Sequence, residues 1–170
     1  MVIGALGRCG KGAVDFCSAA GLPQESVLKW DMAETASGGP FPECRLSDLL
    51  INCVYLGPHR IPPFATHEYL SAPGRRLRVI CDPRSENNPI PVYSGYSSFE
   101  NPTTATSPKI DSPELRVTAI DHLPTLVARE SSEEYSSLLL PSLLTLDRRD
   151  REGVWKRAEQ TYRGRVKELP

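Results

Sequence analysis

The chain has 170 residues, enough for about one domain, and 39% of them are hydrophobic, so it can bury a core. Twenty Lys and Arg against 21 Asp and Glu give a formal net charge of −1, which disfavours a nucleic-acid binder that depends on phosphate contacts. The sequence has no apolar run of about 18 residues and no signal-peptide pattern at its start, so we expect no membrane span and a cytoplasmic protein.

Five apolar runs have the length and composition of β-strands. They are residues 2–6, 27–30, 49–55, 77–81 and 115–120. The run at 49–55 is apolar almost throughout, which is typical of a strand covered on both faces of a parallel sheet. Residues 13–20, between the first two strands, have helical spacing and end at Gly21-Leu22-Pro23, a sequence typical of a helix end.

The later part of the chain has a different composition. Residues 94–113 are rich in Ser, Thr, Pro and Asn and predict a long surface loop, and 89–93 can form at most an edge or extended segment because it holds two prolines. Residues 130–140 predict a helix that Pro141 bends or restarts, and 154–169 predict an amphipathic closing helix.

The order strand, helix, strand, followed by further strands with short connections, predicts an α/β fold. We expect a Rossmann-like, mostly parallel open sheet with flanking helices and a C-terminal helical extension. The sheet domain is expected at residues 1–128 and the helical segment at residues 129–170.

A glycine-rich turn lies where the first strand passes into the first helix. Gly4, Gly7 and Gly10 follow the pattern Gly-x-x-Gly-x-x-Gly. In dinucleotide-binding folds one glycine makes the tight turn, another lets backbone amides approach a pyrophosphate, and a third lets helix and strand pack closely. The helix N-terminus then faces the anion with unpaired donors and the positive end of its dipole. By itself, the pattern also fits an ordinary turn.

Asp31 closes the second apolar run, about twenty residues beyond the glycines. A carboxylate there accepts hydrogen bonds from both hydroxyls of a ribose, and its charge repels a 2′-phosphate. With the glycine turn, this acid predicts that residues 1–128 bind NAD in preference to NADP.

A P-loop is excluded, because Gly10-Lys11 is followed by Gly12 where a P-loop needs Ser or Thr for magnesium.

Motifs spread along the chain fit one family of enzymes. They are Gly4-Ala5-Leu6-Gly7-Arg8-Cys9-Gly10, Lys29-Trp30-Asp31, Glu34-Thr35, Gly38-Gly39-Pro40-Phe41, Ile51–Leu56, Arg75–Arg78, Asn88–Tyr93 and Ile120–Pro124. Their order and spacing, from Met1 to about Arg165, resemble the fungal saccharopine dehydrogenases, which are NAD-dependent and lysine-forming. The resemblance implies conversion of saccharopine, NAD and water to lysine, 2-oxoglutarate and NADH, the last step of lysine biosynthesis through α-aminoadipate.

The resemblance also implies roles for individual residues. The family's cofactor-binding positions match Gly7, Arg8, Asp31, Thr35, Tyr55, Ile120, Asp121, His122 and Leu123. The first two would meet the pyrophosphate, the next two the adenosine ribose and the last four the nicotinamide and its ribose, while Tyr55 would flank the cofactor. His122 is assigned to the cofactor because the family does not use this histidine in catalysis. We predict no catalytic residue and no metal ligand in this chain.

Two differences from the family pattern affect the substrate site. The stretch from Val79 to Asn88 is shorter than in the family, and we assign substrate contacts there to Cys81, Asp82 and Pro83. The family also has a domain before the glycine turn, with the lysine and histidine of its acid–base chemistry, and proton transfer needs such groups within hydrogen-bond reach. We therefore expect a fragment that is inactive alone. It would bind saccharopine, lysine or 2-oxoglutarate only with that domain, against which residues 129–170 would pack.

Two alternatives stay open at this point. The alanine dehydrogenase and transhydrogenase group shares the dinucleotide fold, although the motifs at 29–31 and 120–122 argue against it. The chain could also be a non-catalytic NAD-binding module that functions without a substrate domain. Titration with NADH and NADPH tests whether either nucleotide binds.

Five cysteines, at positions 9, 17, 44, 53 and 81, include no Cys-x-x-Cys pair. This gives little support to a disulfide scaffold or a structural zinc site, and we interpret them as small, buried hydrophobic residues in a reducing compartment. Cys9 and Cys53 are expected as neighbours at the carboxyl edge of the sheet, which leaves a redox link open, but we expect two free thiols.

Overall fold

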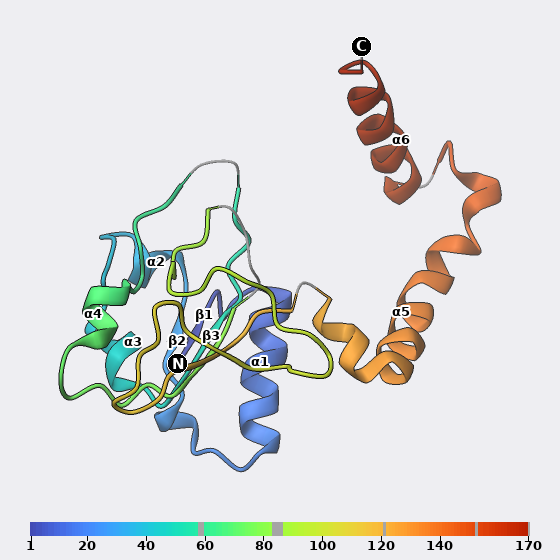
Figure 1. Cartoon of the computed structure of the whole chain (residues 1–170). Helices are drawn as coiled ribbons and strands as arrows, with labels where there is room; N and C mark the ends of the chain where they lie inside the picture. The colour runs from blue at the N-terminus through green and yellow to red at the C-terminus, as the bar shows by residue number, and fades with distance from the viewer. Residues whose placement is uncertain (58–59, 83–86, 121, 152, 170) are drawn as a thin grey trace. The chain divides into compact units, whose positions relative to one another are not determined.

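The computed structural model describes residues 1–57, 60–82, 87–120, 122–151 and 153–169 (Figure 1). The chain divides into two compact units, Met1–Asp121 and His122–Pro170, and each is described by itself. The domain boundary expected between residues 128 and 129 stays a prediction.

The first unit is built on a six-stranded sheet with the strand order β2-β1-β3-β4-β6-β5. The strands are β1 (Val2–Ile3), β2 (Lys29–Trp30), β3 (Leu49–Asn52), β4 (Val79–Cys81), β5 (Thr104–Ala105) and β6 (Arg116–Thr118). All neighbouring strands are parallel except β5, which is antiparallel to β6. The expected Rossmann-like α/β fold with a mostly parallel sheet is confirmed.

The strand order reverses at β1, which pairs with β2 on one side and with β3 on the other. In open α/β sheets, ligands bind beyond the carboxyl ends of the strands at such a reversal. The fold therefore singles out the ends of β1, β2 and β3 as the place to look for a site.

Short helices connect the parallel strands. They are α1 (Arg8–Ala19), the 3₁₀ helix η1 (Gln24–Ser26), α2 (Met32–Thr35), α3 (Pro42–Leu46) and α4 (His67–Ser71). Helix α3 begins with a proline, whose fixed φ suits a first helical position. In α4 the Thr66 hydroxyl oxygen accepts from the Tyr69 amide at 3.2 Å and caps the helix. Local sequence thus determines where these short helices begin.

The hydrophobic core lies mainly on one face of the sheet. Four strands each point a fully buried side chain into it: Ile3, Leu50, Ile80 and Val117. Phe41 and Phe64 pack there too, and Trp30 contacts Phe41 edge-on at 5.2 Å between ring centroids. On β3 the alternate residues Leu49 and Ile51 are only partly buried. Within the first unit, one face of this strand is fully covered and the other only partly, so coverage on both faces stays a prediction.

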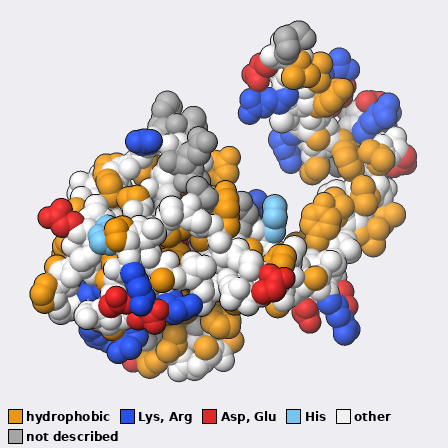
Figure 2. Space-filling view, viewed as in Figure 1, with side chains coloured by type: hydrophobic (Ala, Val, Ile, Leu, Met, Phe, Trp, Pro, Cys, Tyr) orange, Lys and Arg blue, Asp and Glu red, His pale blue; other side chains and the backbone are white. Residues whose placement is uncertain are grey.

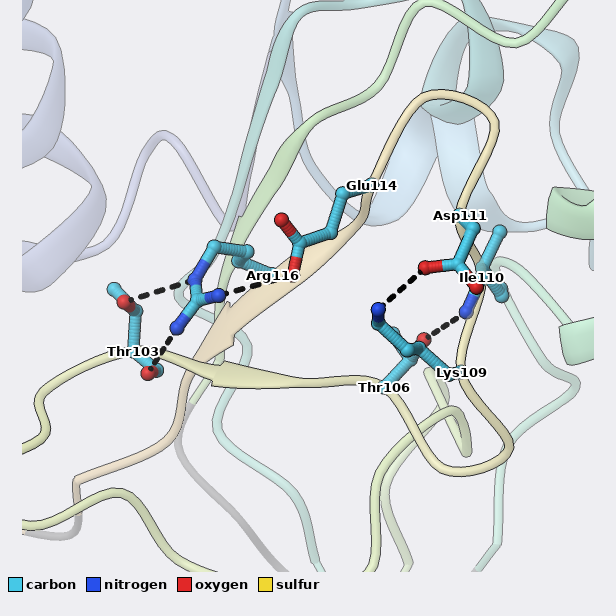
Figure 3. A network of polar contacts seen from close by, with 7 residues as sticks. All are labelled: Thr103, Thr106, Lys109, Ile110, Asp111, Glu114 and Arg116. Atoms are coloured by element: carbon cyan, nitrogen blue, oxygen red, sulfur yellow. Dashed lines mark hydrogen bonds and ion pairs between the residues drawn. The ribbon is translucent and has the colours of Figure 1, made fainter.

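Residues 94–113, expected to form a surface loop, contain the short edge strand β5. Arg116 of β6 donates to the Thr103 hydroxyl oxygen at 3.2 Å and the Thr103 carbonyl at 2.9 Å, and pairs with Glu114 at 3.0 Å (Figure 3). The same view shows contacts in the loop after β5 from Ile110 to Thr106 and from Lys109 to Asp111. Arg116 thus ties the polar segment to the sheet together with Ser97, whose amide donates to the Ala119 carbonyl at 2.9 Å.

The second unit is helical. It contains η2 (Leu123–Val127), α5 (Ala128–Leu143), η3 (Leu146–Arg148) and α6 (Gly153–Val166). Helix α5 runs through Pro141 to Leu143, so a new helix does not begin at the proline. The Trp155 indole N–H donates to the Ser142 carbonyl at 3.1 Å and to the Thr145 hydroxyl at 3.2 Å, which links α6 to the end of α5.

No described residue of α5 or α6 is buried. Apolar side chains lie on the surface of the unit (Figure 2), among them Tyr135, Leu138 and Leu144, which are each about two thirds exposed. Among the described residues, none of the helices is both long enough and apolar enough to cross a membrane.

Candidate functional site

The turn between β1 and α1 is held by backbone contacts with the two neighbouring strands. The amides of Gly4 and Ala5 both donate to the Trp30 carbonyl, at 2.8 and 3.0 Å. Gly4 has φ +80°, and a Cβ there would lie 2.8 Å from the carbonyl oxygen of Cys53. Both the conformation and the close approach therefore require glycine.

Gly10 sets the distance between α1 and this turn. A Cβ at Gly10 would lie 2.0 Å from the Gly4 carbonyl oxygen and 2.6 Å from the Cα of Ala5. Gly7 is the N-cap residue of α1, and no side chain caps the helix. The first amides of a 12-residue helix therefore face the carboxyl edge, where the positive end of the helix dipole favours an anion.

Asp31 directly follows β2 and caps α2. Its carboxylate accepts from the Leu6 amide and from the Met32 amide, both at 2.9 Å, and Glu34 accepts from the Asp31 amide at 2.7 Å. The capping box adds a contact from the Glu34 amide, so three backbone donors leave about one of the roughly four acceptor positions of an ionised carboxylate for a ribose hydroxyl. The hydroxyl of Thr35 donates to the Asp31 carbonyl at 2.9 Å, which holds the Thr35 side chain beside Asp31.

A cleft of about 580 Å³ lies beside these residues. It is lined by Gly4, Gly7, Asp31, Met32, Thr35, Ala36, Cys53–Gly57, Ile61, Pro62 and Phe64. The structure thus brings together four of the predicted cofactor-binding residues, Gly7, Asp31, Thr35 and Tyr55. Arg8 is exposed at the first position of α1, next to this lining. Tyr55 is 95% exposed, so its ring is available to a ligand rather than used in the core.

The other predicted cofactor residues lie elsewhere along the chain. Ile120 is 5% exposed near the end of the first unit. Asp121 lies outside the described residues. His122 and Leu123 belong to the second unit, as the N-cap and first residue of η2. Their roles stay predictions.

Asp82, one of the three predicted substrate residues, follows β4 and is 0% exposed. Its Oδ1 accepts from Asn52 at 2.8 Å and its Oδ2 accepts from the Tyr93 hydroxyl at 2.8 Å. Burial raises the pKa of Asp82 to about 6, while its hydrogen bonds to Asn52, Tyr93 and Asn88 act in the opposite direction. Asp82 therefore has no exposed surface with which to contact a substrate in this structure.

Cys81 is partly buried in β4, and Pro83 lies outside the described residues. The partners of Asp82, Asn52 and Tyr93, do not follow from the motifs of the sequence. One signal in the sequence pointed to such a partner: Asn52 is a polar residue at the end of an otherwise apolar strand. A buried polar side chain needs a hydrogen-bonding partner. The two substrate assignments at positions 81 and 83 stay predictions.

All five cysteines are free. Burial raises the pKa of Cys44 to about 12 and that of Cys53 to about 11, and Cys81 is shifted in the same direction for the same reason. These thiols stay protonated at neutral pH and are poor nucleophiles. Cys9 is exposed, so the interpretation of all five as buried hydrophobic residues is wrong for this one. Within the described parts of the chain, no group of three or more potential ligands could hold a metal ion.

Comparison with known proteins gives one consistent result, although no family model matches. A Schizosaccharomyces pombe protein named saccharopine dehydrogenase [NAD(+), L-lysine-forming] is 48% identical over 173 residues, covering 99% of this chain and 47% of the relative. Proteins of the same name from Neurospora crassa and Emericella nidulans are 47% and 48% identical to this chain. Both matches include all of this chain, but only 46% of the first protein and 47% of the second.

The resemblance seen in the sequence motifs is therefore confirmed as homology along the whole chain. The chain spans just under half the length of these curated relatives. The comparisons favour this family over the alanine dehydrogenase and transhydrogenase group.

The glycine turn allows a direct test of the packing argument. Gly10→Ala should destabilise the chain by about 3 kcal/mol, because the new methyl group meets backbone atoms that cannot move aside cheaply. Gly12→Ala, two residues along the same helix, meets nothing within 4 Å and should stabilise by up to about 1 kcal/mol through helix propensity. Urea unfolding of the two variants measures the difference, and equal effects would contradict the argument.

The pKa of Asp82 predicts a pH dependence of stability. Because it is about 6 in the folded chain and ordinarily 3.8, the buried carboxyl stabilises the fold below about pH 4. This contribution is lost as the pH rises through about 6. Relative to Asp82→Asn, which does not titrate, the free energy of unfolding should fall by on the order of 3 kcal/mol between these limits. Urea titrations across this range check it, and a constant difference between the two proteins would refute it.

Proposed function

We propose that this chain provides the NAD-binding part of a saccharopine dehydrogenase. The observation that carries the proposal is the cleft at the reversal of the strand order. Gly7, Asp31, Thr35 and Tyr55 line this cleft. The chain is 48% identical in sequence to a protein of that name. The proposed overall reaction converts saccharopine, NAD and water to lysine, 2-oxoglutarate and NADH.

The residues of the cleft fit the parts of a dinucleotide. Gly7 and Arg8, at the start of α1, would meet the pyrophosphate with backbone donors and a positive charge. Asp31 has acceptor capacity for the adenosine ribose, and Thr35 lies beside it. Tyr55 offers an exposed aromatic ring to flank the cofactor. When bound, NAD supplies the hydride acceptor of the reaction.

At the other end of the cofactor, we propose that Ile120, Asp121, His122 and Leu123 bind the nicotinamide and its ribose. The support is the family resemblance of the segment Ile120–Pro124. Substrate contacts are proposed for Cys81 and Pro83. Asp82 has its oxygens occupied by internal hydrogen bonds, so we assign it no direct contact.

Acid–base chemistry is proposed to come from sequence that the relatives have beyond the part matched here. More than half of each relative's length lies outside the match. The apolar side chains exposed on residues 129–170, with no buried residue in α5 or α6, support the proposal that this segment packs against that remaining part. Saccharopine, lysine and 2-oxoglutarate would bind only when both parts are present.

Nucleotide preference tests the role of Asp31. The chain should bind NADH at least tenfold more tightly than NADPH, because the carboxylate pairs with ribose hydroxyls and repels a 2′-phosphate. Asp31→Asn should reduce this preference to about threefold or less, since it removes the charge while an asparagine still caps α2. Glu34→Gln removes a nearby charge outside the cleft lining and is the matched control.

Fluorescence titration measures both nucleotides with all three proteins. Equal binding of NADH and NADPH by the unchanged chain, or binding of neither, would exclude the proposed role of Asp31.

An activity assay tests whether this chain binds the cofactor while the remaining part of the relatives supplies proton transfer. The purified 170-residue chain should bind NADH but leave saccharopine unoxidised. Adding the complementary part of the Schizosaccharomyces pombe enzyme should restore formation of NADH from NAD and saccharopine. Turnover by the chain alone would contradict the assignment of proton transfer to the other part. NADH binding without turnover in the mixture would favour a non-catalytic NAD-binding module.

A further inference from the structure

A group of polar side chains at the ends of β3 and β4 is joined by hydrogen bonds. Asp82 bonds to Asn52 through one carboxylate oxygen and to Tyr93 through the other, each at 2.8 Å. The Tyr93 hydroxyl also accepts from the side-chain amide of Asn88 at 2.9 Å. Tyr93 and Asn88 belong to residues 87–93, which we call the brace segment. The group therefore connects the ends of β3 and β4 to a segment that is not part of the sheet.

The first connection from this group to the cleft runs through Asn52. While its amide nitrogen donates to Asp82, its oxygen accepts from the Val54 amide at 3.2 Å. Val54 lines the cleft and is followed by the exposed Tyr55. Asp82 thus orients the amide that fixes the turn leading into the 53–57 part of the cleft wall.

The second connection runs through the brace segment. The Pro89 carbonyl accepts from the Phe64 amide at 2.8 Å, and the Asn87 side chain donates to the Gly57 carbonyl at 3.2 Å. Gly57 and Phe64 both line the cleft. The brace segment therefore holds the wall at two places, and Tyr93 joins it to Asp82.

The hydrogen bonds of this group can be satisfied with Asp82 either ionised or protonated. In the ionised form, Tyr93 donates to the carboxylate at 2.8 Å. In the protonated form, the carboxyl can donate to the Tyr93 oxygen, while the Tyr93 hydroxyl turns to the Asp82 carbonyl, 3.2 Å away. An amide at position 82 can make the same bonds as the protonated acid.

We propose that Tyr93 and Asp82 are positioning residues that set the affinity of the cleft for the adenosine half of a dinucleotide. They act by holding the cleft wall formed by residues 53–57 and 61–64. Neither touches the ligand. This proposal rests on the proposed function, because it assumes that the cleft binds a dinucleotide.

Tyr93→Phe is the decisive variant, because it removes only the hydroxyl of a partly buried side chain. With the full 170-residue chain, the dissociation constants for NADH and for competing AMP should each rise about fivefold. Asp82→Asn should stay within about twofold of the unchanged chain, because the introduced amide restores the bonds to Asn52 and Tyr93.

Thr106→Val is the matched control for lost stability. It also removes a buried hydrogen bond, from the Ile110 amide to the Thr106 hydroxyl at 3.0 Å, and Thr106 is not among the residues that line the cleft. Its nucleotide affinity should equal that of the unchanged chain. Hydrogen exchange at the Val54 and Phe64 amides should be faster in Tyr93→Phe than in Thr106→Val, since only the former loosens the wall.

The outcomes separate the two proposals. If Tyr93→Phe binds NADH and AMP as tightly as Thr106→Val does, the positioning role is overturned while NAD binding stands. If Asp82→Asn weakens binding as much as Tyr93→Phe, the charge rather than the hydrogen-bond pattern matters, and the proposal is again overturned. If the unchanged chain binds no NADH, the proposed function fails and this inference fails with it.

Discussion

The close packing of α1 against the turn that follows β1 is the constraint on which the candidate site depends. At Gly10 the helix comes so near to the Gly4 carbonyl that a side chain has no room. The same turn donates two backbone hydrogen bonds to Trp30 and lies against the carbonyl of Cys53. The ends of three strands and the positive end of a helix dipole are thereby fixed together. Backbone packing thus fixes the shape of the cleft, and the side chains that line it project from this fixed backbone.

Strands of two to four residues supply few hydrogen bonds by themselves. Hydrogen bonds from the loops therefore stabilise much of the structure at the carboxyl edge. Asp82 lies at the centre of this support, because it joins the ends of β3 and β4 to the brace segment. The brace segment, in turn, contacts the cleft wall at Gly57 and Phe64. The shape of the site is therefore coupled to residues that do not line the cleft.

Two aspartates at this edge have opposite environments, and their proposed roles differ accordingly. Asp31 accepts from three backbone amides and lines the cleft, with acceptor capacity left for a hydroxyl group. Asp82 is fully buried between neutral donors, and burial raises its pKa to about 6. We therefore propose recognition for the first carboxylate and positioning for the second. The chain spans just under half the length of its relatives, which agrees with the proposal that it supplies cofactor recognition and not the complete reaction.

The sequence by itself determined the glycine turn and the acid that follows β2, because each depends on spacing within a short stretch of chain. It also determined the parallel sheet, because that follows from the order of strands and helices along the chain. Tertiary structure alone decided the contact of Asn52 with Asp82, since these residues are 30 positions apart. It also decided the unequal burial of the two faces of β3 and the pairing of β5 with β6. Periodicity shows that a side chain is apolar, but what covers it depends on segments that only folding brings together.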